Sequence, residues 1–238
     1  MIEVDRPQDR VLRLRLNRPE RRNAIDGATL EGLAGVFGGD GAGISAVVLS
    51  ARGVFCSGLD LSLADRDRAE VSDRLYSLYR SMVRYPRPIV AAAHGHAIGA
   101  GAQLLMASDL RVVSPHCEIR LPGPEHGLAV GSWALPGLVG RGRAMDLCLT
   151  MRPVGSEEAL RIGLVDRVAD DPEAAALAIA GELAALDVSA VQRVKSVVAA
   201  AGGLEQALQA EADANRGRSP TVGRLDRGGR GEEGAKWS

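Results

Sequence analysis

The chain has 238 residues, of which 46% are hydrophobic and 25% are charged. This composition excludes an intrinsically disordered protein, and the length fits one large domain or one domain with an appendage. The 29 Lys and Arg residues and the 30 Asp and Glu residues leave a formal net charge of -1. We therefore expect no partner that is bound through overall charge, such as nucleic acid or an anionic membrane surface.

The N-terminal residues lack a targeting pattern. Residues 1–7 include two acidic side chains and no apolar core, so a secretory signal is not expected. The three cysteines, Cys56, Cys117 and Cys148, are odd in number and form no CxxC pair, which argues against a disulfide framework and against a zinc knuckle. We therefore expect a cytoplasmic protein.

The first half of the chain alternates between strand and helix patterns. Leu and Arg alternate over residues 11–17, as in a half-buried strand. Residues 68–85 carry apolar side chains at helical spacing, which predicts an amphipathic helix that ends before Pro86 and Pro88. A shorter helix is expected at 102–108, and short apolar runs predict further strands at 46–50, 89–93 and 110–114. Strands that alternate with helices indicate an α/β fold.

Residues 88–108 are long enough to span a bilayer and contain no Asp, Glu, Lys or Arg. They also contain His94, His96 and Gln103 together with three glycines. We therefore interpret this segment as a buried strand, loop and helix, and we expect no membrane span.

Helix patterns dominate the second half. Ser156 predicts the start of a helix that stops at Gly163, and residues 165–168 favour one last strand. Asp171 before Pro172 is typical of a helix cap. The Ala-rich helix that follows it, and two more at 188–201 and 204–214, suggest a region used for assembly. We therefore divide the chain into a core over 1–170, a helical C-terminal region over 171–215 and a flexible Gly- and Arg-rich tail over 216–238.

Two glycine-rich segments, 53–60 and 95–103, each follow a predicted strand. Each offers unpaired backbone N–H groups, and the second adds a helix N-terminus with its partial positive charge. Two such loops that converge could hold a developing carbonyl oxyanion. The spacing of Gly95, Gly99 and Gly101 differs from the G-x-G-x-x-G pattern, so a dinucleotide site is not indicated.

Several segments, in order, give the chain a resemblance to the crotonase (enoyl-CoA hydratase/isomerase) superfamily up to about residue 200. They are Leu16-Asn-Arg-Pro-Glu-Arg-Arg-Asn-Ala24, Phe55-Cys-Ser-Gly-Leu-Asp-Leu61, Ala97-Ile-Gly-Ala-Gly-Ala-Gln-Leu104, Leu121-Pro-Gly-Pro-Glu-His-Gly-Leu128 and Glu157-Glu-Ala-Leu-Arg-Ile-Gly-Leu-Val165. The resemblance implies a spiral of ββα units, a C-terminal α-helical trimerisation region and a homotrimer or dimer of trimers. It also implies an acyl-CoA thioester as ligand, with no separate cofactor.

By this resemblance, the thioester carbonyl is held by two backbone N–H groups, which fall on Ser57 and Ala100. Helix 68–85 would flank the acyl chain with Leu75, Leu78 and Met82. The remaining substrate contacts implied along the chain are Arg22, Ala24, Gly58, Leu59, Asp60, Leu61, Gly99, Gln103 and Gly123. For Asp60 the resemblance implies a structural role, fixing the loop, and not a catalytic one.

The sequence departs from the hydratase pattern at the two glutamates that activate water and deliver a proton. Gln103 and Gly123 stand at these positions. Glutamine cannot take a proton from water and glycine offers no side chain, so the loss of both disfavours hydration by the usual route. Glu125 lies two residues further on and is an alternative acid/base group, with His126 beside it.

Two function hypotheses follow. The first is a protein that binds fatty acyl-CoA through the two amides and lacks conventional hydratase activity; the second is an active hydratase or isomerase that uses Glu125. We interpret His94 and His96 as loop-packing residues because no third metal ligand is placed near them, and Cys56 as an oxyanion-loop residue because no base is assignable beside it.

Overall fold

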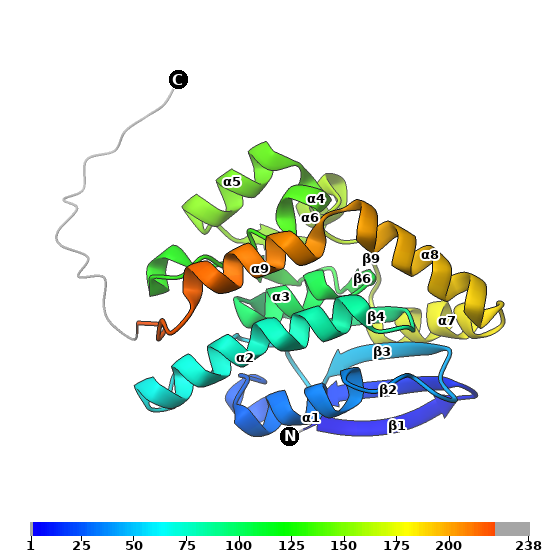
Figure 1. Cartoon of the computed structure of the whole chain (residues 1–238). Helices are drawn as coiled ribbons and strands as arrows, with labels where there is room; N and C mark the ends of the chain where they lie inside the picture. Colours follow the sequence, from blue (N-terminus) through cyan, green and yellow to red (C-terminus); the bar gives the residue numbers. More distant parts are fainter. Residues whose placement is uncertain (1, 222–238) are drawn as a thin grey trace.

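The computed structural model describes residues 2–221, which form two sheets and the helices packed on them (Figure 1). The main sheet has the order β1-β2-β3-β4-β6-β9, and only its edge strand β1 runs antiparallel to its neighbour. Its strands are β1 (Ile2–Gln8), β2 (Val11–Leu16), β3 (Ala46–Ala51), β4 (Ile89–Ala93), β6 (Leu110–Val113) and β9 (Arg167–Val168). The second sheet consists of β5 (His96–Ile98), β7 (Glu118–Arg120) and β8 (Val154–Gly155).

Consecutive strands pass from one sheet to the other. β4 lies in the main sheet and β5 in the smaller one, and β6 and β7 repeat this step. The helices are α1 (Gly27–Phe37), α2 (Asp65–Arg84), α3 (Ala100–Ala107), α4 (Leu135–Val139), α5 (Arg141–Thr150), α6 (Ser156–Ile162), α7 (Pro172–Ala184), α8 (Val188–Ala201) and α9 (Leu204–Asn215). A strand from each sheet followed by a helix, as in β4-β5-α3, gives the ββα spiral expected of an α/β protein of this kind.

The main sheet is covered on both faces because its strand residues alternate between two apolar clusters. One face, which includes Leu12, Leu14 and Leu49, packs against α1, α2 and α3. The other face packs against α7 and is formed by Val11, Ala46, Val48, Val90, Ala92 and Val112. The prediction of doubly covered strands at 46–50 and 89–93 is confirmed.

The predicted helix ends are also confirmed. Asp171 accepts a hydrogen bond from the Ala174 amide at 2.9 Å and so caps α7. Gly163 ends α6 in the left-handed conformation with φ 82°, which glycine adopts without steric cost. Glu173, in the first turn of α7, forms ion pairs with Arg13 and Arg15 on β2. The helical region 171–215 is therefore packed on the core rather than set apart from it.

Several elements, among them α1 and β1, were not expected from the sequence. α1 contains Gly32 and Gly35, which lower helix propensity and hide the apolar period. β1 has only two half-buried residues and is otherwise exposed, so its pattern does not alternate clearly. It is held as an edge strand by its antiparallel pairing with β2.

Residues 88–108 form β4, β5 and the whole of α3, as interpreted, and are largely buried. Within residues 2–221 no single helix is long and apolar enough to cross a membrane, although α7 and α8, bent at 113°, pass that test of length and composition as a pair.

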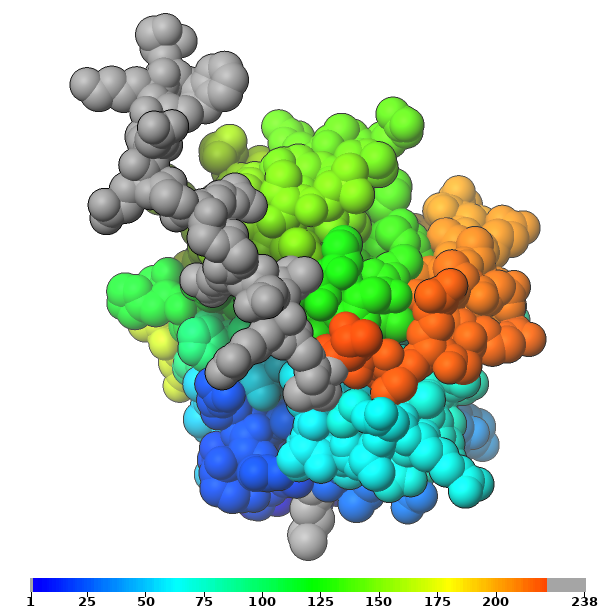
Figure 2. Space-filling model, turned by 90° about the vertical axis from the view of Figure 1, so that its left-hand side faces the viewer, coloured from blue at the N-terminus to red at the C-terminus, as the bar shows by residue number. Residues whose placement is uncertain are grey.

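The first residues of the predicted flexible tail, 216–221, form hydrogen bonds with the folded part of the chain. Arg218 N–H donates to the Asn215 carbonyl, and the Thr221 amide donates to the His126 carbonyl at 3.2 Å. Residues 216–221 are therefore fixed against the body of the protein, which corrects the prediction for this stretch. Figure 2 shows the end of the described chain between the cyan α2 and a green segment. The rest of the predicted tail lies outside the described residues.

Candidate functional site

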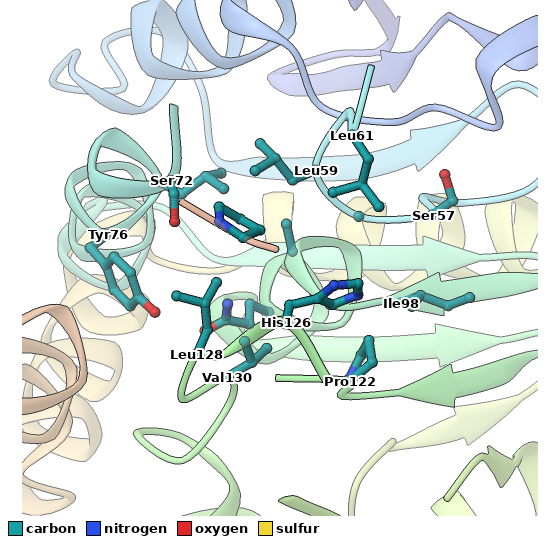
Figure 3. Close-up of a pocket in the computed structure, with 16 residues that line it drawn as sticks. Ser57, Leu59, Leu61, Ser72, Tyr76, Ile98, Pro122, His126, Leu128 and Val130 are labelled. Atoms are coloured by element: carbon teal, nitrogen blue, oxygen red, sulfur yellow. The ribbon is translucent and has the colours of Figure 1, made fainter. Parts of the chain in front are cut away.

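A cavity of about 630 Å³, part of it open to solvent, lies where the loop after β3, the start of α3, α2 and the loop after β7 meet (Figure 3). Most of its lining is apolar. The lining residues are Ser57, Gly58, Leu59, Leu61, Ser72, Leu75, Tyr76, Ile98, Gly99, Ala100, Gln103, Pro122, His126, Leu128, Val130 and Pro220. Both glycine-rich segments singled out in the sequence contribute to this one cavity.

The amide of Ser57 is not available to a ligand. It donates to the carbonyl oxygen of Arg22 at 3.0 Å. The prediction that this N–H holds a carbonyl oxygen is therefore wrong, although Ser57 itself lines the cavity.

The amide of Leu59 is available instead. The neighbouring Gly58 carbonyl accepts from Ile25 N–H at 2.8 Å, and Asp60 N–H donates to the Ile25 carbonyl at 2.9 Å. In extended chain, alternate residues direct their backbone groups to opposite sides, so Leu59 N–H points away from Ile25. Within residues 2–221 this N–H has no acceptor. The turn that separates Leu59 from Ser57 is made by Gly58, at φ 105°.

The amide of Ala100 is the second unpaired donor. Ala100 is the first residue of α3, and the first N–H groups of a helix have no partner within it. Its N–H has no acceptor among residues 2–221. A side-chain carbon built on Gly58 would lie 3.1 Å from the Ile98 carbonyl oxygen and 3.9 Å from Ala100 N, so the two loops are in contact.

Gly101 permits this contact. A Cβ atom at this position would lie 2.4 Å from the carbonyl oxygen of Cys56, closer than a side chain can approach. Because Gly101 has none, the start of α3 rests directly on the Cys56 backbone, and β5 forms a parallel bridge to it at Ala97. The close packing sets the spacing between the amides of Leu59 and Ala100.

Buried polar groups fix the loop that carries Leu59. The side chain of Asn23 donates to the carbonyls of Arg52 and Val54 at 2.9 and 2.7 Å. Asp60 accepts from Ser62 and Arg18. Burial opposes the charge on Asp60, but these hydrogen bonds outweigh it and lower the pKa of its carboxyl. Asp60 is therefore a structural anchor and does not line the cavity.

The remaining loop residues of the predicted contact set differ in their position. Leu61 and Gly99 line the cavity, whereas Arg22 and Ala24 do not. Arg22 is exposed beside the loop, and no ion pair to it is found within residues 2–221.

Gln103 lines the cavity, and its side chain is hydrogen-bonded to a residue of the protein interior. It is 4% exposed, and its side-chain oxygen accepts from the indole N–H of Trp133 at 2.9 Å. Next to it, the Tyr76 hydroxyl donates to the buried Glu211 at 3.1 Å. Burial, followed by the negative charge of Glu211, raises the pKa of Tyr76 well above its ordinary value. Neither Gln103 nor Tyr76 can therefore take up a proton from a ligand near neutral pH.

Gly123 has no room for a side chain. A Cβ atom there would lie 2.6 Å from the Leu128 carbonyl oxygen and 2.9 Å from the Val130 amide nitrogen. Gly123 does not line the cavity, and the neighbouring Pro122 does so. A glutamate side chain at this position would therefore require the backbone to shift.

Glu125 lies beside the cavity but does not line it. Its carboxylate accepts from Arg120 at 2.9 Å, with both side chains more than a third exposed. The next residue, His126, lines the cavity in its place, and Figure 3 shows its ring among the labelled side chains. The alternative hypothesis expected Glu125 in the cavity, but in the turn Pro124–His126 it is His126 that lines it.

Only part of the α2 face that was expected to flank an acyl chain lies at the cavity. Leu75 lines the cavity, together with Ser72 and Tyr76 from the same helix face. Leu78 and Met82 are buried in the main core instead. Sequence spacing identified the apolar face of the helix, but it could not show which end of that face reaches the cavity.

Other reactive groups do not form a site. Burial raises the pKa of the Cys56 thiol to about 12, so it is protonated and a poor nucleophile near neutral pH. Within residues 2–221 no three His, Cys, Asp or Glu side chains lie together in a way that could hold a metal ion.

The model of the enoyl-CoA hydratase/isomerase family matches residues 6–222. A probable enoyl-CoA hydratase, EchA6, of Mycobacterium bovis is 40% identical over 206 residues, which cover 84% of this chain and 83% of the relative. A crystal structure of an enoyl-CoA hydratase from Bacillus anthracis has a TM-score of 0.81 at 28% identity and covers 91% of this chain and 90% of its own. One of an enoyl-CoA hydratase/isomerase from Mycobacterium paratuberculosis has a TM-score of 0.80 at 29% identity, with coverage of 90% and 93%.

Proposed function

The chain belongs to the enoyl-CoA hydratase/isomerase family, and we propose that it binds the thioester of a fatty acyl-CoA with the carbonyl oxygen between the amides of Leu59 and Ala100. One observation carries this proposal: Leu59 and Ala100, whose backbone N–H groups have no acceptor within residues 2–221, line the same cavity. Preorganised donors of this kind stabilise a carbonyl oxygen as negative charge develops on it.

We also propose that the protein lacks conventional hydratase activity. Among the described residues that line the cavity there is no Asp or Glu. Conventional hydration in this family uses carboxylates to activate the water and to deliver a proton, and the amide side chain of Gln103 can do neither. The amides alone can bind and polarise a thioester without completing the addition of water.

The coenzyme A part of the ligand would follow the loop surface outside the cavity. Arg22 is exposed at this loop and has no acidic partner within residues 2–221, so its charge is available to a phosphate group. The apolar lining from Leu75, Leu128 and Val130 suits an acyl chain.

Assembly is proposed as a homotrimer or dimer of trimers. Helix α8 exposes Val194, Val197 and Val198 to 64%, 68% and 66%. A row of exposed apolar side chains on one helix supports an interface. Light scattering of the purified protein tests this; a monomer at micromolar concentration would refute it.

Calorimetric titration with hexanoyl-CoA, and with free coenzyme A as the comparison, tests the proposed function. We expect the thioester to bind more tightly than free coenzyme A. The same preparation is then incubated with crotonyl-CoA, and the absorbance of the conjugated thioester is followed. Binding with a constant absorbance is the expected result. Failure to bind the thioester would refute the first proposal, and rapid loss of absorbance would refute the second.

A further inference from the structure

We propose that His126 is the proton-transferring group of this cavity: its Nε2 removes and returns a proton on the carbon next to the thioester carbonyl. The inference rests on the proposed function, because it requires a thioester whose carbonyl oxygen lies at the amides of Leu59 and Ala100. Neither the family resemblance nor the predicted site assigned this role to a histidine.

His126 is the one imidazole on the described cavity wall, and a neutral imidazole has a ring nitrogen whose lone pair can accept a proton. The other ionisable lining side chain is Tyr76, whose pKa is raised well above its ordinary value by burial. The rest of the lining consists of apolar residues, glycines, serines and Gln103. Histidine, by contrast, is the side chain that most often acts as a general acid or base in enzymes.

The hydrogen bonding of His126 assigns its tautomer. Nδ1 lies 3.0 Å from the carbonyl oxygen of Thr221. A carbonyl oxygen only accepts, so Nδ1 carries the proton and Nε2 presents its lone pair. Within residues 2–221 Nε2 has no hydrogen-bond partner. A bond at one ring nitrogen that orients the other is the usual way in which a catalytic imidazole is prepared.

His126 and Thr221 are joined by a second hydrogen bond. The Thr221 amide donates to the His126 carbonyl at 3.2 Å, so residues 126 and 221 are joined by both backbone and side-chain bonds. Pro220, next to Thr221, forms part of the cavity wall. The start of the C-terminal segment therefore lies beside the ring at the cavity wall.

The proposed step balances without another reactant. Nε2 takes the proton as the C–H bond breaks, and the electron pair of that bond moves into the carbonyl to give an enolate. The amides of Leu59 and Ala100 hold the enolate oxygen. Return of the proton to the same carbon restores the thioester, and its return to the fourth carbon of a 3-enoyl thioester gives the conjugated 2-enoyl isomer.

The test follows deuterium uptake by hexanoyl-CoA in D₂O, measured by mass spectrometry, beside its dissociation constant measured by calorimetry. We expect the unmodified protein to deuterate the ligand at the carbon next to the carbonyl. His126→Asn keeps an N–H that can donate to Thr221 but has no basic nitrogen. It should bind hexanoyl-CoA as the unmodified protein does and exchange at least about 100-fold more slowly.

Two further variants complete the design. His116→Asn, on an exposed histidine away from the cavity, should exchange at the original rate. His126→Ala should regain part of its exchange when imidazole is added, which a purely structural role of His126 would not produce. Glu125→Gln tests the carboxylate of the alternative hypothesis and should exchange normally.

Each outcome decides one point. Binding by the unmodified protein without deuterium uptake would overturn the role of His126 and leave the proposed function in place. Uptake that persists in His126→Asn, or that is lost in Glu125→Gln, would also overturn it. Loss of binding together with exchange in His126→Asn would assign the residue to holding segment 219–221. Absence of binding by the unmodified protein would refute the proposed function itself.

Discussion

Replacing Ala100 by proline removes one of the two proposed donors and changes little else. Ala100 is the first residue of α3, after the cap residue Gly99. Proline is favoured at this helix position because its fixed φ suits the helix and the lost N–H has no partner within it. The N–H also has no acceptor elsewhere in residues 2–221, so no existing hydrogen bond is broken.

The size of the effect follows from what one amide contributes. A net contribution of about 0.5–1.5 kcal/mol for a neutral hydrogen bond predicts that the dissociation constant for hexanoyl-CoA rises about 2- to 13-fold. In a step that places negative charge on the carbonyl oxygen, the loss of one donor costs about 10²- to 10³-fold in rate. We therefore expect Ala100→Pro to slow proton exchange far more than it weakens binding.

The assay is the infrared stretch of a ¹³C-labelled thioester carbonyl in bound hexanoyl-CoA. Hydrogen bonding lowers this frequency, so the unmodified protein should shift it downwards and Ala100→Pro should lose much of the shift. Ala100→Ser retains the N–H and serves as the matched control. An unchanged shift and affinity in Ala100→Pro would show that this amide does not hold the carbonyl.

Three further predictions concern the packing and charge of the fold, and each is tested by urea unfolding. Gly101→Ala should destabilise by about 1–3 kcal/mol because its Cβ would meet the Cys56 carbonyl, whereas Gly142→Ala on α5, with no atom within 4 Å, should be neutral or stabilising by up to about 1 kcal/mol. Asp171→Ala should lose the α7 cap and about 1 kcal/mol. The hydrogen bond from Arg15 lowers the pKa of Glu173 from 4.5 to about 2. The ion pair of Glu173 therefore stabilises the fold fully above pH 4.5, and this stabilisation is lost as the pH falls towards 2. It is worth about 1–2 kcal/mol after allowance for solvent screening. Glu173→Gln should abolish this pH dependence.

Each of these three has an outcome that would contradict its reasoning. Equal stabilisation by Gly101→Ala and Gly142→Ala would mean that α3 does not rest on the Cys56 backbone. Asp170→Ala, on an exposed neighbour, is the control for the cap and should cost less than Asp171→Ala. If the free energy of unfolding of Glu173→Gln falls below pH 4.5 as steeply as that of the unmodified protein, the ion pair is not the cause of the pH dependence.

Local patterns predicted those elements whose apolar period is uninterrupted. The strands at 46–50 and 89–93 and the helices α6 and α7 carry clear runs or caps, and they form where expected. α1 and β1 were not predicted because glycines dilute the period of one and exposure hides the pattern of the other.

The site was predicted at the level of its loops and not of its atoms. The sequence showed that segments 53–60 and 95–103 both leave strands, and the structure brings both to one cavity. It could not show which amide is free, because that depends on the turn at Gly58 and on the bond from Ser57 to Arg22.

The loop after β7 shows the same limit for side chains. Glu125 is the more conspicuous residue in the sequence, yet Arg120 holds it outside the cavity and His126 faces inwards. A turn of three residues, Pro124–His126, decides which neighbour faces the ligand. The charges in the sequence could not predict which of the two side chains faces inwards. The hydrogen-bond partner of His126, Thr221, lies 95 residues away, so local sequence could not reveal it either.

The proposed donors at positions 59 and 100 belong to the peptide backbone, which every amino acid except proline supplies. Mutation can therefore exchange the side chains there for many generations without erasing the capacity to grip a carbonyl. Under this proposal the vulnerable positions are Gly101, where an added Cβ would lie 2.4 Å from the Cys56 carbonyl oxygen, and Gly58, where φ is 105°. Descendants that have drifted in chemistry can thus retain an ancestral hold on their ligand.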